Sequence, residues 1–189
     1  MNFCSVCGEK VNIAIPEGDN RPRHICGSCG IIHYQNPKMV VGCLIEHENK
    51  ILLCKRAIEP RYGLWTLPAG FMENDETTMQ AAQRETQEEA GADVEVVELF
   101  TMFSLPHIDQ VYMLYRAKFK NFGFSSGPES LEVELFDEAD IPWDEMAFPV
   151  ISESLKRYFV DRKKGVFQIH TGAMIKEAGE FQVTVLSDD

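Results

Sequence analysis

One segment constrains this chain more than any other. Residues 76–90 contain no glycine or proline and are followed by Gly91, which predicts a helix that ends at that glycine. At about 100° per residue, Glu85, Glu88 and Glu89 fall within about 100° of arc on one helix face. The neighbouring face is mostly apolar and consists of Met79, Ala82, Thr86 and Ala90. The helix must therefore pack on a sheet while it gathers three carboxylates.

The three carboxylates allow two interpretations. Glutamate-rich helices often expose a solvated acidic face, but here Arg84 is the only neighbouring cation and no lysine lies at i±4. Unrelieved, the like charges repel by a few tenths of a kcal/mol per pair. Clustered carboxylates are also typical of sites for Mg²⁺ or Mn²⁺, which prefer oxygen ligands. The pattern favours such a metal site.

The charge balance bears on the ligand of this site. The 189 residues include 18 Lys+Arg and 30 Asp+Glu, so the formal net charge is −12. Nucleic acid and anionic membranes are held by basic residues, and the acidic balance argues against both as partners. A phosphate-bearing small molecule remains compatible, provided that a bound metal ion supplies the positive charge.

Four of the six cysteines form two Cys-x-x-Cys pairs, Cys4/Cys7 and Cys26/Cys29, separated by eighteen residues. This spacing is typical of a zinc ribbon, in which four thiolates enclose Zn²⁺ in a closed tetrahedron. A redox dithiol is the alternative, but neither pair lies in a βαβ context. A module of about 30 residues has too little apolar core to fold alone, so we expect structural zinc in residues 1–35.

The rest of the sequence alternates strand and helix patterns. Strands are predicted at 39–46, 50–56, 64–68, 94–103, 110–119 and 131–136, and a second amphipathic helix at 149–163. Strands interleaved with two helices imply an α/β domain, here 36–165, whose sheet is covered on both faces. The C-terminal extension, 166–189, has weaker strand signals at 166–170 and 181–186.

The helical segment resembles the signature of the Nudix hydrolases, G-x5-E-x7-R-E-U-x-E-E-x-G-U, where U is a bulky apolar residue. Every fixed position matches, namely Gly70, Glu76, Arg84, Glu85, Glu88, Glu89 and Gly91. The departures are Thr86 and Ala92 at the two U positions, which concern packing rather than chemistry. The resemblance extends over about residues 38–160. It implies an α/β/α sandwich with a mixed sheet, preceded here by the small zinc ribbon.

The resemblance implies an enzyme that hydrolyses the pyrophosphate bond of a nucleoside diphosphate derivative with Mg²⁺ or Mn²⁺. Glu85 and Glu89 match the principal metal ligands and Glu88 a further one. The backbone at Ala69 and Gly70 completes the coordination. The resemblance also implies a catalytic role for Arg84, which orients the glutamates through an ion pair, and a structural role for Glu76 at the helix end.

The general base varies across the family and can come from a downstream acidic residue. Three candidates lie close together after the glycine-rich loop, Glu129, Glu132 and Glu134. Glu132 best matches the family's extra acidic ligand, and Glu134 would share its strand face. These residues could equally be ordinary exposed strand positions.

Two groups combine a zinc ribbon with a Nudix domain. The bacterial NADH pyrophosphatases carry a Ser-Gln-Pro-Trp-Pro-Phe-Pro signature that is absent from residues 103–112 here. The ADP-ribose/FAD pyrophosphatases, which include plant FAD pyrophosphatases, are similar over residues 127–132, 141–142 and 147–148. The resemblance therefore favours ADP-ribose and FAD as substrates. NADH or NAD-capped RNA, and a non-catalytic ADP-ribose sensor, stay as alternatives.

Candidate contacts for an adenine or flavin ring are Phe103, His107, Tyr112 and Phe148. Residues of these types are more often plain core or rim positions. No apolar run is long enough to cross a membrane and no signal peptide is apparent, so we expect a cytoplasmic protein. Nudix enzymes of this size are often homodimers, but nothing in this sequence demands one.

Overall fold

The computed structural model describes residues 1–177 and 180–185. The chain divides into two compact units, Met1–Pro37 and Lys38–Asp189. The first unit contains a three-stranded antiparallel sheet of β1 (Val11–Ala14), β2 (Arg23–Cys26) and β3 (Ile32–His33), in the order β1-β2-β3. Its only buried side chains are those of Cys4 and Cys26. This unit thus has almost no apolar core.

The second unit is built on a nine-stranded sheet with the path β10-β5-β4-β9-β8-β11-β12, in which β6 pairs with β5 and β7 with β4. The strands are β4 (Lys38–His47), β5 (Lys50–Arg56), β6 (Trp65–Thr66), β7 (Ala69–Phe71), β8 (Val94–Leu105), β9 (Gln110–Phe119), β10 (Ser130–Phe136), β11 (His170–Glu177) and β12 (Glu180–Val185). Strand pairs β4/β9 and β8/β11 are parallel and the others antiparallel, so the sheet is mixed.

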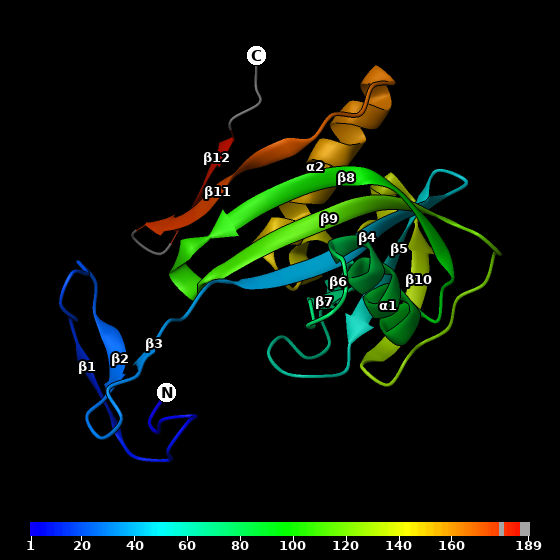
Figure 1. Cartoon of the computed structure of the whole chain (residues 1–189). Helices are drawn as coiled ribbons and strands as arrows, with labels where there is room; N and C mark the ends of the chain where they lie inside the picture. Colours follow the sequence, from blue (N-terminus) through cyan, green and yellow to red (C-terminus); the bar gives the residue numbers. More distant parts are fainter. Residues whose placement is uncertain (178–179, 186–189) are drawn as a thin grey trace. The chain divides into compact units, whose positions relative to one another are not determined.

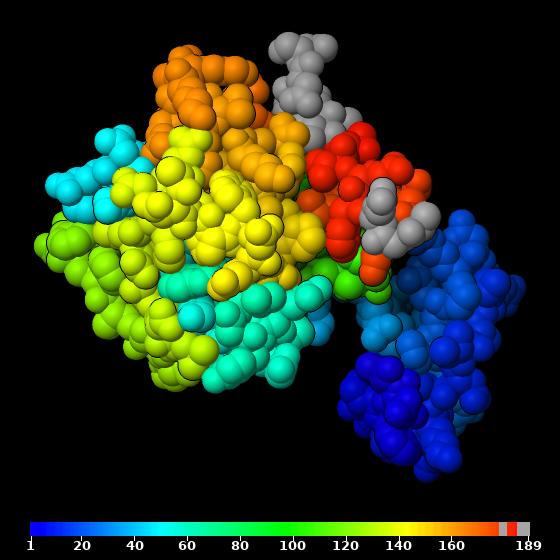
Figure 2. Space-filling model, turned by 180° about the vertical axis from the view of Figure 1, so that it is seen from behind, coloured from blue at the N-terminus to red at the C-terminus, as the bar shows by residue number. Residues whose placement is uncertain are grey.

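Two helices cover the sheet from opposite sides, α1 (Thr78–Ala90) and α2 (Pro149–Lys164) (Figure 1). Alternate residues of β4 serve the two faces: Leu44 joins the apolar cluster under α2, whereas Cys43 joins the cluster under α1. From behind, α2 and residues 137–148 form one outer layer (Figure 2). Short 3₁₀ turns η2 (Glu138–Asp140) and η3 (Trp143–Glu145) lead into α2, and η1 (Pro106–Ile108) joins β8 to β9. The predicted α/β/α sandwich with a mixed sheet is confirmed.

The glutamate-rich helix begins two residues later than predicted. Thr77 is its N-cap and forms a capping box with Gln80, so Glu76 lies before the first turn rather than within it. At the other end Gly91 has a φ of 58°, a left-handed conformation that favours glycine. The predicted apolar face also needs correction, because Met79 is 46% exposed and Ala81 is fully buried in its place.

Three other predicted elements differ from the structure. The strand predicted at 64–68 is only the two-residue β6, and the next residues form the separate strand β7. The strand predicted at 166–170 was wrong over 166–169, and β11 starts at His170. The strand predicted at 181–186 corresponds to β12, although its last residue, Leu186, lies outside the described residues.

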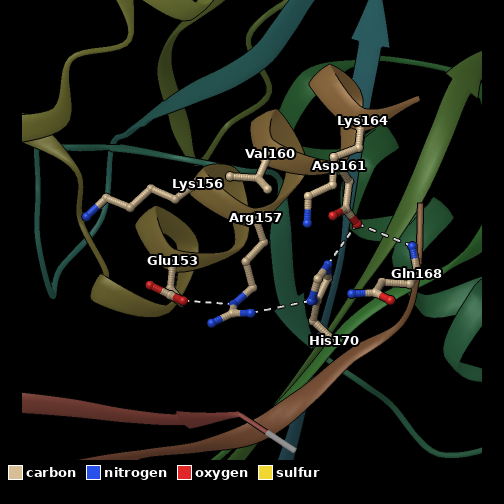
Figure 3. Close-up of a pocket in the computed structure, with 8 residues that line it drawn as sticks. All are labelled: Glu153, Lys156, Arg157, Val160, Asp161, Lys164, Gln168 and His170. Atoms are coloured by element: carbon tan, nitrogen blue, oxygen red, sulfur yellow. Dashed lines mark hydrogen bonds and ion pairs between the residues drawn. The ribbon is translucent and has the colours of Figure 1, made fainter. Parts of the chain in front are cut away.

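A polar network explains why residues 166–169 do not join the sheet (Figure 3). The buried carboxylate of Asp161 on α2 accepts hydrogen bonds from the Gln168 N–H at 3.3 Å and from Nε2 of His170 at 2.8 Å. Arg157 lies 3.4 Å from the other ring nitrogen, and because arginine only donates, His170 carries its proton on Nε2. The backbone that leads into β11 is therefore tied to the helix.

Candidate active site

Glu89 is the most deeply buried carboxylate of the helix face, with 6% of the residue exposed. It reaches the site from the last turn of α1, where the Ala69 N–H donates to its Oε2 at 2.9 Å. Burial raises its pKa to about 7, and the charges of Glu85 and Glu129 add to that effect. Burial of an ionised carboxylate beside other acids is energetically unfavourable unless a cation binds to it.

Arg84 holds the acidic face together. Its guanidinium contacts Glu76 at 2.7 Å, Glu85 at 2.7 Å and Glu88 at 3.0 Å, and it donates to the Phe71 carbonyl at 3.1 Å. These contacts lower the pKa of Glu76 to about 2. Burial raises the pKa of Glu85 above its usual range despite the arginine. One cation thus orients three carboxylates of unequal burial.

Close approach, rather than unusual backbone geometry, explains the glycine that precedes the helix. A Cβ at Gly70 would overlap the carboxylate of Glu85, so a side chain there would displace the acid. A Cβ at Gly127 would likewise overlap the backbone carbonyl of Glu88, in the last turn of the helix. The two glycines let a strand and a loop lie directly against α1.

The loop 121–129 completes the site. Its Ser125 and Gly127 N–H groups donate to the carbonyls of Ala90 and Glu89 at 2.8 and 3.1 Å, which satisfies free acceptors at the C-terminus of α1. This docking brings the exposed Glu129 close enough for its charge to raise the pKa of both Glu85 and Glu89, behind the larger effect of burial.

The other two candidate bases lie on β10. Glu132 forms an ion pair with Lys55 of β5 at 2.9 Å, and Glu134 is exposed further along the same strand. Glu129, and not Glu132 or Glu134, is among the main groups that raise the pKa of Glu85 and Glu89. The assignment of Glu132 as an extra ligand stays a prediction, and the structure draws attention to Glu129.

The predicted ring contacts fall into different environments. Phe103 is fully buried in the core, so it presents no ring face to a ligand, and His107 is exposed in η1 beside Phe181. Tyr112, which is buried, and Phe148, which is half-buried, are the two that lie near the acidic site, since both neighbour Arg56. Sequence reasoning missed Arg56, whose only signal was a charge at the end of an apolar strand.

The cysteine cluster of the first unit has the dimensions of a tetrahedral metal site. Its four sulfurs lie within 4.8 Å of one another, and three of the pairs are separated by 3.4, 3.6 and 3.7 Å. Four thiolates around Zn²⁺ at 2.3 Å would be separated by roughly 3.8 Å. Hydrogen bonds from the Cys29 and Ser28 N–H groups lower the pKa of Cys26 to about 7, whereas the neighbouring sulfurs raise the pKa of Cys7 and Cys29, so some of the sulfurs stay protonated unless a cation takes the place of those protons. The residues fit structural zinc.

The acidic cluster also fits hard divalent cations. It combines buried and exposed carboxylates, has a net negative charge and contains Arg84 as its only directly bonded cation among the described residues. Oxygen donors of this kind suit Mg²⁺ or Mn²⁺. Glu85, Glu88 and Glu89 would hold such ions, which can neutralise phosphate oxygens and activate water.

Comparison with known proteins agrees with this geometry. The family model described as NUDIX domain matches residues 36–158, and the model described as Nudix N-terminal matches residues 2–35. The chain belongs to the Nudix hydrolase family. Within the family's signature, Thr86 and Ala92 occupy the two positions that are usually bulky, and both are fully buried. The Thr86 hydroxyl donates to the Ala82 carbonyl at 2.8 Å, so its burial leaves no unpaired polar group.

The crystal structure of a Nudix hydrolase from Nitrosomonas europaea is 59% identical, covers 93% of this chain and all of that chain, and has a TM-score of 0.90. An ADP-ribose pyrophosphatase from Methanocaldococcus jannaschii is 34% identical over 58% of this chain and 67% of its own length. A NAD-capped RNA hydrolase from Vibrio atlanticus is also 34% identical, over 53% of this chain. The match spans only 35% of that protein.

These matches establish this Nudix chain as an enzyme of the hydrolase class. Among the described residues, neither helix is long and apolar enough to cross a membrane.

Proposed function

We propose that this Nudix hydrolase cleaves the pyrophosphate bond of a nucleoside diphosphate derivative with Mg²⁺ or Mn²⁺, and that ADP-ribose and FAD are its preferred substrates. The products would be AMP with ribose 5-phosphate, or AMP with FMN. The observation that carries the proposal is the convergence of Glu85, Glu88, Glu89 and Glu129 beside the Ala69–Gly70 backbone. We further propose that residues 1–35 bind structural zinc.

The chain's own residues divide the work. Glu85, Glu88 and Glu89 hold the divalent ions, which when bound neutralise charge on the phosphate oxygens and lower the pKa of the attacking water. Arg84 fixes the carboxylates, and the Ala69 N–H fixes Glu89. Glu129 accepts the proton that the water loses as it attacks phosphorus, because its exposed carboxylate faces the same cluster from the opposing loop.

The relatives support two substrate classes to different degrees. The archaeal ADP-ribose pyrophosphatase aligns over most of its length, which favours a small dinucleotide-like substrate. The NAD-capped RNA hydrolases align over only about a third to a half of theirs. Their repeated occurrence among the matches makes hydrolysis of NAD-type substrates the second candidate, although the net charge of −12 opposes binding of an RNA body.

A hydrolysis panel tests the proposal. ADP-ribose, FAD, NADH and NAD-capped RNA are incubated with the full chain and Mg²⁺ or Mn²⁺, and AMP release is followed by chromatography with an EDTA control. We expect turnover of ADP-ribose or FAD that EDTA abolishes. Preference for NADH or capped RNA would favour the second candidate, and ADP-ribose binding without any turnover would overturn the enzymatic proposal in favour of a sensor.

The assignment of Glu129 as the general base is tested with a matched pair of variants. Glu129→Gln should lower kcat by about 10²- to 10⁴-fold, the range for losing a general base. Glu132→Gln removes an acid that lies three residues further along the chain and pairs with Lys55 at 2.9 Å, and this variant serves as the control. A kcat that falls only in the Glu132 variant would restore Glu132 to that role.

A further inference from the structure

Arg56 is a buried cation that does not form an ion pair with the acidic cluster. It ends β5, and only 9% of the residue is exposed. Its Nε donates to the Pro60 carbonyl at 3.0 Å, while its backbone exchanges hydrogen bonds with Leu64 and Gly63 at 2.9 Å each. The guanidinium is therefore held in place by the loop that follows its own strand.

The positive charge of Arg56 has no carboxylate partner among the described residues. By contrast, two other partly buried arginines have carboxylate partners, since Arg84 pairs with three glutamates and Arg116 with Glu98. Among the described residues, Arg56 forms no such ion pair, and its side chain donates a single hydrogen bond, from Nε to the Pro60 carbonyl. Burial of a guanidinium with unpaired terminal nitrogens is energetically unfavourable unless an anion binds to those nitrogens.

The surroundings of Arg56 indicate where that anion would lie. Arg56 pairs with Ser130 of β10, and the N–H of the next residue, Ala57, donates to the Glu129 carbonyl at 2.8 Å, so the end of β5 lies against the loop that carries Glu129. The ring of Phe148 covers the guanidinium, with its centroid 5.1 Å from the guanidinium carbon. The charge of Arg56 also acts on the pKa of Glu89, behind the larger effect of burial, which is consistent with a place beside the acidic site.

We propose that Arg56 binds two non-bridging oxygens of the substrate's diphosphate and thereby selects diphosphates over monophosphates. The planar fork of arginine matches phosphate oxygens in bidentate geometry, and its terminal nitrogens are uncommitted. Arg84 cannot serve in this way because three glutamates already occupy its guanidinium. The proposal rests on the proposed function, since it names the residue that holds the substrate of that site.

The test compares Arg56→Met, Arg56→Lys and the control Arg116→Met. Arg116 is likewise a shielded arginine against an aromatic ring, but it pairs with Glu98 on β8. With ADP-ribose and saturating Mg²⁺, Arg56→Met should raise KM by roughly 10- to 100-fold, the equivalent of one charge-assisted hydrogen-bonding group. Arg56→Lys should recover part of that loss, and Arg116→Met should keep the wild-type KM.

A second readout separates this inference from catalysis. Isothermal titration calorimetry of ADP-ribose and AMP into the full chain in EDTA measures binding without hydrolysis. Wild type should bind ADP-ribose. Arg56→Met should weaken this affinity by the same factor as it raises KM, and Glu89→Gln should leave the affinity unchanged. Guanidinium ions should partly restore binding to Arg56→Ala. If wild type binds ADP-ribose in EDTA but does not hydrolyse it once Mg²⁺ or Mn²⁺ is supplied, only the proposed function fails. The role of Arg56 would be overturned if folded Arg56→Met and Arg56→Lys kept the wild-type KM and affinity. It would also be overturned if wild type did not bind ADP-ribose.

Discussion

Residues 1–37 bury two side chains, both of them cysteines, whereas residues 38–189 enclose apolar clusters on both faces of a nine-stranded sheet. The small unit also exposes large apolar residues such as Ile13, at 68%, and Val6, at 66%. The difference shows that metal ligands and apolar packing are alternative ways to hold a fold. Chain length decides between them, because a short chain cannot remove enough apolar surface from water.

Metal ligands consequently play opposite energetic roles in the two units. In the small unit, the four thiols constitute the core, so we expect binding of zinc and folding to be the same process. In the large unit, Glu89 is a buried acid among other acids, placed in a fold that apolar packing already stabilises. As the proposed metal ligand, Glu89 would serve chemistry at the expense of stability.

The largest expected effect comes from removing zinc. Structural zinc contributes about 10–16 kcal/mol to modules of this kind, so chelation should unfold residues 1–37 and leave the second unit folded. Both tryptophans, Trp65 and Trp143, lie in the second unit and report it alone. Amide exchange should therefore show loss of protection in the small unit with no change in tryptophan fluorescence.

Two fully buried cysteines provide the matched control for this experiment. Cys26→Ala should release the metal and unfold the small unit, whereas Cys43→Ala, in the core beneath α1, should retain zinc and destabilise the second unit by about 1 kcal/mol. Persistent amide protection of residues 1–37 in Cys26→Ala would mean that apolar packing holds this unit after all.

Glu89→Gln should have the next largest effect, and its two consequences should have opposite signs. We expect kcat to fall by about 10³-fold, as when a group that stabilises the transition state is removed. The folded pKa of about 7 exceeds the ordinary value of 4.5, so the ionised carboxyl destabilises the fold above the lower value, and fully so above the higher one. At pH 8 in EDTA, the variant should gain about 1–3 kcal/mol in free energy of unfolding.

Urea titrations followed by tryptophan fluorescence measure this gain, and AMP release measures the rate. Glu132→Gln, an exposed partner of Lys55, should change stability only slightly. A variant at Glu89 that is both inactive and markedly less stable would show that the carboxylate supports the fold, against the contrast drawn here between the two units.

The smallest expected effect comes from truncating an exposed apolar side chain of the small unit, in contrast to a buried one of the large unit. Leu114 is fully buried between the sheet and α2, and Leu114→Ala should lower the free energy of unfolding by about 2–5 kcal/mol. Ile13→Ala in the small unit should change stability by less than about 0.5 kcal/mol, because its side chain is already in water. Thermal unfolding with a separate zinc-release assay distinguishes the two units. A large loss in Ile13→Ala would contradict the metal-based core.

The sequence predicted the features that depend on local spacing. The two Cys-x-x-Cys pairs, the strands around Lys50–Arg56 and Gln110–Phe119, and the helix that ends at Gly91 all follow from periodicity and termination signals within one segment. One of its errors, the strand predicted over 166–169, is explained by a contact with another element. Residues 166–169 are tied to Asp161 of α2, a bond that no local pattern of hydrophobicity reveals.

What the sequence by itself determined was the chemical inventory: four thiols at zinc-ribbon spacing, and Glu85, Glu88 and Glu89 on one helix face beside Arg84. Only the tertiary structure decided which distant segments lie against this helix. Loop 121–129 docks on the end of α1, and the Ala57 N–H, next to Arg56 at the end of β5, donates to the Glu129 carbonyl of that loop. The physical reason is that helix periodicity acts over a few residues, whereas burial and charge proximity depend on segments that only folding brings together.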